Sequence, residues 1–449
     1  MQNNADGIKL ERRISLLQAT AINMTDMVGI GPFVVLSIVA QTMNGPWFLY
    51  AWIAGAVLSV IDANVWSQLG SAYPLAGGSY NFLKAGYGEK YGKLMSFLFV
   101  WQTMIQAPLV IASAAIGFSQ YAGYLFHLDT FSAKAVSGTV VLLIVLLLYR
   151  KIETIGKISV FLWMGVLVTM VWIIGGGLWH GNFLAPIKNI NEGLELNHAF
   201  AAAIGFASVK TVYSYLGYYN VCHLGGEIIN PKKNIPRSMF ISIGGIAVLY
   251  LLMNVSVASV LPLQQIQQSK FVVSEFVQTL AGSTAANIAT LLILWVAFAS
   301  VFSATLGYSR IPYAAAADGA FFKVFAKLHP TKHFPHISLL VLGAVAFVFS
   351  LLFKLKDIID AILAMRILIQ FIGQAVGLIL LTKQKGLKHF PWKMPLYPLP
   401  AIAAIIIWGF VLYSTGTKMM LGGLTVTALG IVAFFIKSKR NNEWPFTSN

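Results

Sequence analysis

Twelve runs of predominantly apolar residues occupy most of this 449-residue sequence, and all but the fourth, ninth and eleventh, which are short, approach or exceed the roughly 20 residues that a helix needs to cross a bilayer. They lie at about 16–42, 47–71, 93–121, 135–150, 156–179, 198–224, 238–261, 286–308, 337–353, 357–382, 398–415 and 419–437. Hydrophobic residues make up 57% of the chain and charged residues 10%, whereas soluble domains carry roughly 25% charged residues. The sequence therefore excludes a water-soluble fold and predicts an all-α integral membrane protein with 12 transmembrane helices.

The basic residues predict the orientation of these helices. If the N-terminus is cytoplasmic, 23 of the 31 Lys and Arg fall in the tails and loops on the inner side, six fall in outer loops, and two lie inside spans. This distribution follows the positive-inside rule. We therefore expect a multi-pass protein of the cell (plasma or inner) membrane with both termini cytoplasmic. The net charge of +16 is then an orientation signal, not a nucleic-acid-binding surface.

The loops and tails are too short to fold alone, so function is expected inside the helix bundle. That favours a transporter or channel over a membrane-tethered enzyme or receptor. The first apolar run lacks the features of a cleaved signal peptide and is expected to stay in the membrane. We expect a cytoplasmic tail at 1–14, one transmembrane domain at 15–437 and a second cytoplasmic tail at 438–449, the domain comprising a first repeat at about 15–179, a second at about 198–382 and two further helices at about 398–437.

Two of the predicted spans carry residues that interrupt a helix. Gly29, Gly31 and Pro32 fall near the middle of the first span, and Gly217 lies at comparable depth in the sixth. Glycine favours helix weakly and proline cannot donate to the helical ladder, so backbone groups lose their partners there. Such groups are tolerated at membrane depth only where they face protein, water or a ligand. The alternative is that these residues are packing notches and kinks, which are common in membrane helices.

The two interrupted spans are the first helices of the two halves of a five-plus-five arrangement. Broken helices at corresponding positions of two repeats are a sequence pointer to the central site of a transporter. A half-helix N-terminus attracts a carboxylate, and the carbonyls of a half-helix C-terminus accept from an ammonium group. The pattern therefore suits a zwitterionic substrate.

Four sequence segments resemble known motifs. GIGPF at 29–33 is similar to a Gly-Ser-Gly-Ile-Phe signature, YPLAGGSYNFLKAGYG at 73–88 to a first cytoplasmic loop, YSYLGYYNVCHLGGEIINPKKNIPRSM at 213–239 to a sixth helix and its following loop, and GYSRIPYAAAADGAFFKVFAKLHP at 307–330 to the end of an eighth helix. These motifs are those of amino acid permeases of the amino acid-polyamine-organocation superfamily. The sequence resembles the L-type amino acid transporters and the arginine/agmatine antiporters of that superfamily. The resemblance implies an inverted repeat of five plus five helices, followed by two C-terminal helices, with helices 1 and 6 broken.

The resemblance also implies a substrate site. Residues Gly29, Ile30 and Gly31 would receive the substrate carboxylate through their backbone. The carbonyls around the two breaks would take the amine; these belong to Met27, Tyr213, Ser214 and Leu216, with Gly217 at the second break. Tyr213 resembles the aromatic gate of the family, its alternative role being an interfacial aromatic.

The sequence departs from the family pattern at three positions. Ile30 stands where the signature has serine, and Pro32 where it has isoleucine. The break should persist, because proline suits a first helical turn, but a hydroxyl is missing beside the carboxylate site. Many relatives place in helix 5 a lysine that mimics a bound sodium ion. That position here is Gly165, so coupling through such a lysine is not expected.

Ionisable residues inside spans are the candidates for coupling, since each costs about 2.5–3.5 kcal/mol at a helix centre. Four such residues are present: Asp26, Asp62, Lys210 and Arg366. Two charges of each sign suggest mutual neutralisation, so each is either a proton-coupling group or a permanently paired structural charge.

His223 and Glu227 lie one helical turn apart near the inner end of helix 6. They are also coupling candidates, because the two groups could pass a proton between them. In the alternative interpretation, Glu227 orders the following loop by pairing with Lys232, Lys233 or Arg237, and His223 packs.

Residues 73–93 predict an amphipathic segment at the inner membrane surface, either as part of the inner gate or as an interfacial helix without a gating role. No phosphate-binding loop, nucleophile motif or metal-ligand spacing occurs, so no cofactor and no metal are expected. The one cysteine, Cys222, excludes an intrachain disulfide.

The sequence thus predicts a secondary active transporter that moves amino acids by alternating access, through proton-coupled symport or exchange. One alternative is an exchanger of cationic amino acids or polyamines, in which Asp26 and Asp62 attract the positively charged substrate. The other is an amino-acid sensor that binds without transport. We expect a small-molecule substrate and the lipid bilayer as partners, no nucleic acid and no enzyme activity.

Overall fold

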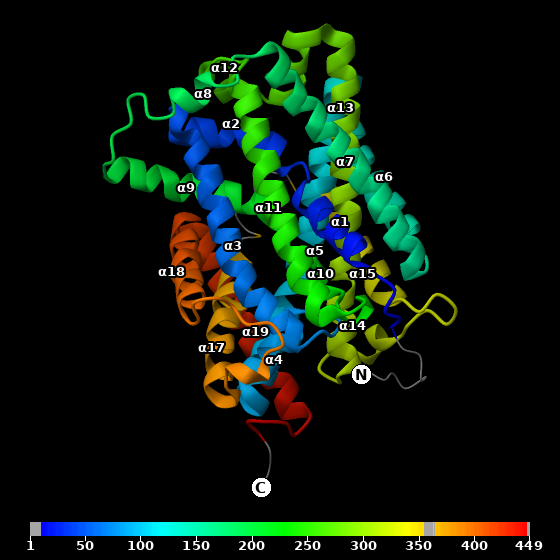
Figure 1. Cartoon of the computed structure of the whole chain (residues 1–449). Coiled ribbons are helices and arrows are strands. Elements are labelled where there is room, and N and C mark those ends of the chain that lie inside the picture. The colour runs from blue at the N-terminus through cyan, green and yellow to red at the C-terminus, as the bar shows by residue number, and fades with distance from the viewer. Residues whose placement is uncertain (1–9, 354–361, 363, 447–449) are drawn as a thin grey trace.

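The computed structural model describes residues 10–353, 362 and 364–446, and this part of the chain is built of helices (Figure 1). Within these residues the extended pairing consists of two isolated bridges, Ile14 with Ile228 and Ala76 with Leu224. The first and last described residues lie at the same end of the bundle. The expected span at 357–382, the tails at 1–14 and 438–449, and the outer-loop residues Lys354 and Lys356 lie partly or wholly outside the described residues.

The helices of the N-terminal half are α1 (Leu16–Met27), α2 (Gly31–Met43), η1 (Pro46–Phe48), α3 (Leu49–Ala72), α4 (Ser79–Gly86), α5 (Gly88–Phe126), α6 (Thr130–Leu148), α7 (Ile152–His180) and α8 (Ala185–Lys188). Those of the middle of the chain are α9 (His198–Tyr215), α10 (Asn220–His223), η2 (Gly225–Glu227), α11 (Pro231–Ala258), α12 (Leu263–Gln268), α13 (Val272–Tyr308), α14 (Arg310–Ala317) and η3 (Lys323–Ala326). The last are α15 (His336–Leu352), the π-helix η4 (Ile367–Gly373), α17 (Gln374–Lys385), η5 (Leu387–His389), α18 (Leu399–Ser414) and α19 (Thr417–Arg440).

Within the described residues, eight helical stretches are long and apolar enough to cross a membrane. They are Pro46–Ala72, Gly88–Phe126, Thr130–Leu148, Ile152–His180, Pro231–Ala258, Val272–Ala317, Ala364–Lys385 and Thr417–Arg440. A ninth is the pair α1 and α2, which meet at a bend of 44°. Two further apolar helices, α15 and α18, are shorter than these stretches. The predicted span at 198–224 is divided between α9 and α10. The prediction of a helical membrane protein is confirmed.

Helix α5 is longer than the sequence predicted, and this changes the interpretation of residues 73–93. The helix begins at Gly88 instead of residue 93 and runs for 39 residues, or about 58 Å at 1.5 Å per residue. The helix that remains in the segment, α4, packs one face against the helix bundle and leaves Lys84 exposed. Its Tyr80, Phe82 and Leu83 are buried, and the backbone of Gly86 lies against Gly377 of α17 so closely that a side chain would not fit.

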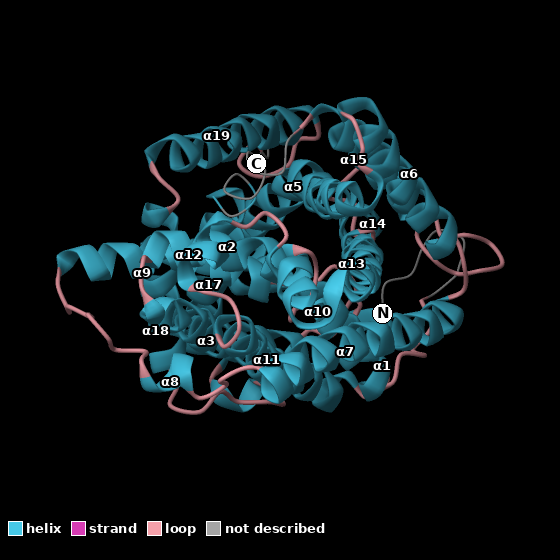
Figure 2. Cartoon of the chain, turned by 90° about the horizontal axis from the view of Figure 1, so that it is seen from above, coloured by secondary structure: helices cyan, strands magenta, loops and turns pink. Residues whose placement is uncertain are grey.

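The helices divide into central and peripheral ones (Figure 2). The stretch Val272–Ala317, which contains α13 and α14, buries 72% of its most apolar part, whereas α19 buries 17%. Helix α13 packs against α5, α7 and α1, and α11 packs against α3 and α1. The exposed apolar side chains of α19 therefore form a surface for lipid, and the broken helix α1 lies in the interior.

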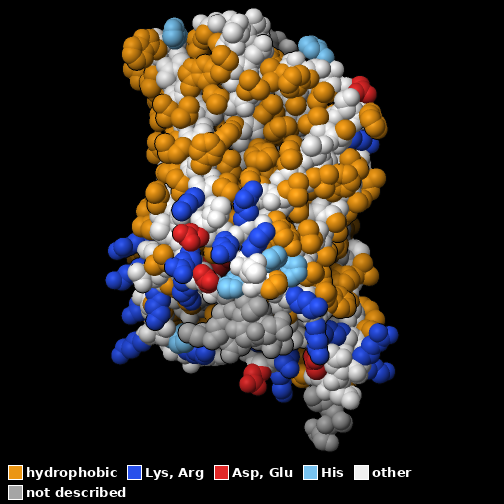
Figure 3. Space-filling model, turned by 90° about the vertical axis from the view of Figure 1, so that its right-hand side faces the viewer, with side chains coloured by type: hydrophobic (Ala, Val, Ile, Leu, Met, Phe, Trp, Pro, Cys, Tyr) orange, Lys and Arg blue, Asp and Glu red, His pale blue; other side chains and the backbone are white. Residues whose placement is uncertain are grey.

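The charged residues gather toward one end of the molecule. On the face drawn in Figure 3, apolar side chains form a continuous band, and most Lys and Arg lie below it, toward the end that carries the termini. This separation of a basic end from an apolar band is the pattern that the sequence predicted from its loops.

A short N-terminal segment crosses the basic end. The amides of Arg13 and Ile14 donate to the carbonyl of Glu227, at 3.0 and 2.9 Å, and the amide of Ile229 donates to Ile14. The Arg12 side chain donates to the carbonyl of Ile228 at 3.1 Å. The segment therefore ties the start of α1 to the loop that follows α10.

Candidate functional site

The first helix break separates α1 from α2. Helix α1 ends at Met27, and Pro32 stands in the first turn of α2. A Cβ at Gly29 would lie 2.6 Å from Ser300 Oγ of α13, and one at Gly31 would lie 3.2 Å from Ser214 Oγ of α9. The glycines therefore let two other helices approach the unwound backbone.

The second break separates α9 from α10. Helix α9 ends at Tyr215, Leu216 is extended, and Gly217 has a φ of +123°, a conformation that favours glycine. A Cβ at Gly217 would lie 2.8–2.9 Å from backbone atoms of Asp26 and Met27. The two breaks therefore touch each other.

Tyr250 of α11 joins the two breaks. Its hydroxyl lies within hydrogen-bond distance of the carbonyl of Met27, at 2.7 Å, and of the carbonyl of Ser214, at 3.0 Å. These carbonyls stand at the C-terminal ends of α1 and α9, where helices leave carbonyls without intrahelical partners. Tyr250 could not be recognised from the sequence, because one tyrosine in an apolar span carries no signal that separates it from a packing residue.

A cavity of about 50 Å³ lies where the breaks meet. All eight residues predicted to bind substrate line it: Met27, Gly29, Ile30, Gly31, Tyr213, Ser214, Leu216 and Gly217. Residues without a role in the prediction complete the wall: Val110 and Ala114 of α5, Tyr219, the α13 residues Ser300, Ala304 and Tyr308, and Ile362. The hydroxyl of Tyr213 lies 3.1 Å from Ser113 Oγ of α5. The cavity is thus enclosed by both breaks and by α5 and α13.

Ile30 explains one departure from the family signature. Its side chain packs against Gly117 of α5, where an added Cβ would overlap it. A large apolar residue in this place therefore fills the contact between the first break and α5. Gly29 and Gly31 still line the cavity.

Asp26 and Arg366, predicted as coupling residues, also line the cavity. Asp26 interacts electrostatically with Arg366 and contacts Asn220. Arg366 precedes the π-helix η4; its Nε donates to Gln370 Oε1 at 2.7 Å, and its guanidinium lies 5.0 Å from the ring of Tyr219. Asp26 therefore interacts with Arg366 electrostatically, without a direct ion pair, and the sequence alone did not indicate this proximity.

Asp62 does not line the cavity. It is 1% exposed, and it accepts hydrogen bonds from the Tyr218 hydroxyl at 2.5 Å and from Trp408 Nε1 at 3.0 Å. The hydrogen-bond donors to Asp62 are thus neutral groups, and Arg366 acts on it electrostatically without a hydrogen bond. Its carboxylate joins α3 to the second break and to α18.

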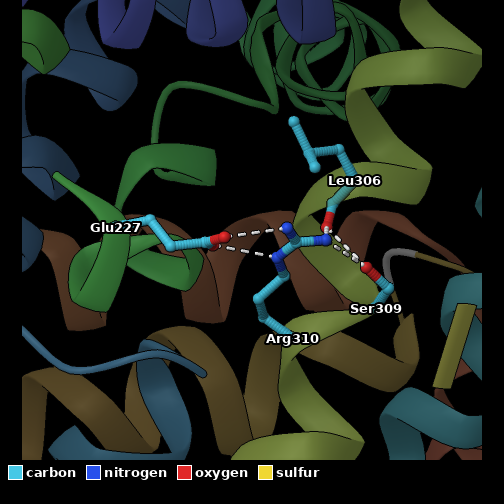
Figure 4. A network of polar contacts seen from close by, with 4 residues as sticks. All are labelled: Glu227, Leu306, Ser309 and Arg310. Carbon is cyan, nitrogen blue, oxygen red and sulfur yellow. Dashed lines mark hydrogen bonds and ion pairs between the residues drawn. The ribbon is translucent and has the colours of Figure 1, made fainter. Parts of the chain in front are cut away.

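Glu227 forms a buried ion pair with Arg310 of α14 (Figure 4). Both bonds of the bidentate contact are 3.0 Å long, from Nε to Oε2 and from Nη2 to Oε1. Arg310 Nη1 donates further to Ser309 Oγ at 2.9 Å and to the Leu306 carbonyl at 3.2 Å. The expected partners Lys232, Lys233 and Arg237 were wrong, because the pairing residue comes from a helix end 83 positions along the chain.

The other two coupling candidates lie outside the cavity lining. His223 is buried beside the rings of Trp66, Tyr219 and Tyr308, which is the packed position of the alternative interpretation. Lys210 is half-buried on α9, about one turn before Ser214. The structure therefore brings two of the six coupling candidates, Asp26 and Arg366, to the cavity.

Gly165, in the position of the family's helix-5 lysine, faces Trp295 of α13. The Trp295 indole N–H donates to the carbonyl of Leu162 at 3.0 Å, and any side chain at position 165 would overlap the indole. An aromatic ring from the neighbouring helix thus occupies the space beside this glycine.

Comparison with known proteins places this geometry in a family of transporters. The family model described as amino acid permease matches residues 14–446. The chain belongs to the amino acid permease family, whose members are membrane transporters and not enzymes.

Individual relatives match along almost the whole chain. The chain is 26% identical over 450 residues to the serine/threonine exchanger SteT of Bacillus subtilis (strain 168), covering 98% of this chain and 99% of that protein. It is 24% identical to the cystine/glutamate transporter of Homo sapiens over 439 residues, 96% of this chain and 86% of that protein. It is also 25% identical to the b(0,+)-type amino acid transporter 1 of Mus musculus over 414 residues, 88% of this chain and 81% of that protein.

Proposed function

We propose that this protein is a secondary active transporter that moves amino acids across the cell membrane by alternating access. The observation that carries the proposal is the meeting of two broken helices around one buried cavity, with helix ends of both kinds at its wall. Helix N-termini bind carboxylates and C-terminal carbonyls accept from ammonium groups. An amino acid therefore finds both complements in the backbone of the breaks.

In this proposal, the amides of Gly29, Ile30 and Gly31 bind the α-carboxylate. The carbonyls around the breaks, from Met27, Tyr213, Ser214 and Leu216, receive the amine, and Gly217 gives the second break its shape. Tyr213 acts as an aromatic gate over the substrate.

The proposed architecture has 12 transmembrane helices. Two inverted repeats, at about 15–179 and 198–382, precede two helices at about 398–437, and the tails 1–14 and 438–449 are cytoplasmic. The even number of spans and the basic end that carries the termini support this orientation.

Coupling is proposed to run through protonation of Asp26, by symport with a proton or during exchange. Asp26 lines the cavity and precedes the first break directly, so substrate binding changes its surroundings. Asp62 and Glu227 already have bonded partners, which favours structural roles for both.

Reconstituted vesicles test the proposal. Labelled amino acids should enter with an imposed proton gradient if the protein is a symporter, and only against internal amino acid if it is an exchanger. Asp26→Asn should retain binding and lose the dependence on the gradient. Binding without flux would instead identify a sensor, and uptake confined to cationic amino acids or polyamines would identify the cationic exchanger.

A matched pair of glycine variants tests the site itself. Gly31→Leu should abolish uptake, because the new side chain meets Ser214 and Tyr213 at the cavity wall. Gly422→Leu is the control, since Gly422 is exposed on α19 with open space around it. Normal uptake by folded Gly31→Leu protein would overturn the proposed site.

A further inference from the structure

Arg366 reaches the cavity with hydrogen-bonding capacity left over. Its side chain is 3% exposed, and a guanidinium has five N–H donors. Nε bonds Gln370, and Nη2 has no hydrogen-bond partner within the described part of the chain. Around it lie aromatic faces, with ring centres of Tyr219 at 5.0 Å, Phe371 at 5.6 Å and Tyr308 at 5.7 Å.

Within the described residues, no nearby carboxylate forms an ion pair with this guanidinium. Asp26 shares the cavity and attracts Arg366, but no ion pair within 4.0 Å joins the two side chains. Asp62 accepts from Tyr218 and Trp408, and Glu227 is held by Arg310. A buried charge without a bonded counter-ion costs several kcal/mol, so an anion that enters the cavity is stabilised at Arg366.

Arg366 and the backbone of the helix breaks come from different parts of the chain, so they can bind two different anionic groups. The breaks come from α1, α2, α9 and α10, whereas Arg366 stands just before η4, next to Ile362 in the wall. The backbone of the breaks can therefore bind the α-carboxylate and the α-amine, which all amino acids share. Arg366 can then bind the substrate's side chain. A π-helix directly after Arg366 supports a functional role, since π-helical turns are frequent at functional sites.

We propose that the substrate is an amino acid whose side chain ends in a carboxylate, and that Arg366 is the counter-ion of that carboxylate. This inference rests on the proposed function and names the substrate class of the same cavity. It argues against a cationic substrate, because Arg366 repels a second positive charge at the cavity wall. Asp26 opposes the substrate carboxylate by like charge, so removing the Asp26 charge should tighten binding of an acidic amino acid.

Ligand-dependent thermal stabilisation of the purified protein in detergent tests the proposal. The probes are L-glutamate, L-aspartate, their amides L-glutamine and L-asparagine, and L-lysine. The wild-type protein should bind the acidic amino acids about tenfold to a hundredfold more tightly than the amides, because hydrogen bonds to charged groups contribute about 1.5–3 kcal/mol. Arg366→Gln should remove this preference and retain binding of the amides. Asp26→Asn should bind the acidic amino acids more tightly than the wild type does.

The control is Arg440→Gln, which makes the same chemical change at an exposed position after the apolar part of α19. If Arg366→Gln does not fold, Arg366→Lys retains the charge and should keep the acidic preference in weakened form, because lysine lacks the bidentate geometry.

Three results would overturn the substrate class. The first is a wild-type preference for neutral or cationic amino acids. The second is an equal loss of affinity for all ligands in Arg366→Gln, which would assign Arg366 to the α-carboxylate. The third is an unchanged preference for acidic amino acids in that variant. In the first and third cases amino acids still bind, so the proposed function stands. If no amino acid binds the wild-type protein, the proposed function fails as well.

Discussion

Two buried arginines of this molecule have opposite surroundings. Arg310 and Arg366 are 1% and 3% exposed, and both belong to segments that pack around the second break and its following loop. Arg310 directs its fork at Glu227 and its remaining donors at Ser309 and Leu306. Arg366 bonds Gln370 and faces aromatic rings. Burial alone therefore does not distinguish the two arginines; the number of N–H donors that already have bonded partners does.

The largest expected effect is on the satisfied arginine. Arg310→Met should lower the free energy of unfolding by about 3–5 kcal/mol, because it leaves the Glu227 carboxylate buried without its partner. Unfolding followed in detergent measures the change. The double variant Arg310→Met with Glu227→Met should recover most of the loss, since it removes both charges. If the single and double variants lose the same free energy of unfolding, the Glu227–Arg310 pair contributes through packing and not through charge.

A second, intermediate effect concerns Asp62, whose carboxylate is satisfied by neutral donors. Tyr218→Phe removes one of its two hydrogen bonds and should lower the free energy of unfolding by about 1–3 kcal/mol. Tyr413→Phe is the matched control, because Tyr413 is 77% exposed and should tolerate the loss of its hydroxyl. Equal stability of the two variants would mean that Trp408 alone satisfies Asp62.

A smaller effect is expected at the unsatisfied arginine. Arg366→Met should change the free energy of unfolding by less than about 1 kcal/mol in the absence of substrate, because removing the desolvation cost of the guanidinium offsets the lost bond to Gln370 and the lost attraction to Asp26. The same unfolding assay compares it directly with Arg310→Met. Equal losses in the two variants would break the comparison and place Arg366 among the structural charges.

The smallest effect concerns an exposed contact at the basic end. A hydrogen bond from His333 and a second from Arg13 lower the pKa of Glu11 below its ordinary value of 4.5. A lowered pKa means that the contact stabilises the fold above this value and is lost as the pH falls through the folded-state pKa. The amides of Arg13 and Ile14 should then exchange hydrogen faster at acidic pH, after correction for intrinsic rates. Glu11→Gln should remove this pH dependence. If the amides of the variant still exchange faster at acidic pH, a group other than Glu11 causes the effect.

The backbone of the site was more predictable from the sequence than its side-chain partners. The helix breaks could be predicted from Gly29, Gly31, Pro32 and Gly217, because glycine and proline change the backbone conformation at their own positions. Whether these residues bind substrate stays a prediction, but the structure brings them to one cavity.

The pairing of charges was not predictable in the same way. Depth in the membrane can be counted along a helix, but the direction of a side chain around the helix axis cannot be assigned without its neighbours. Asp26 is therefore near Arg366, and Glu227 bonds Arg310, 83 positions away, instead of the lysines that follow it. Trp295 beside Gly165 is a second example, since the space beside a glycine belongs to a different helix.

The hydroxyl of Tyr250 has one hydrogen and two acceptors, the carbonyls of Met27 and Ser214. At any instant one of these oxygens accepts the hydrogen fully and the other has a lone pair to spare. An ammonium group brings three hydrogens to the same place, enough for both carbonyls and the phenol oxygen together. A protonated amine is therefore a group that can donate to all three of these oxygens at once.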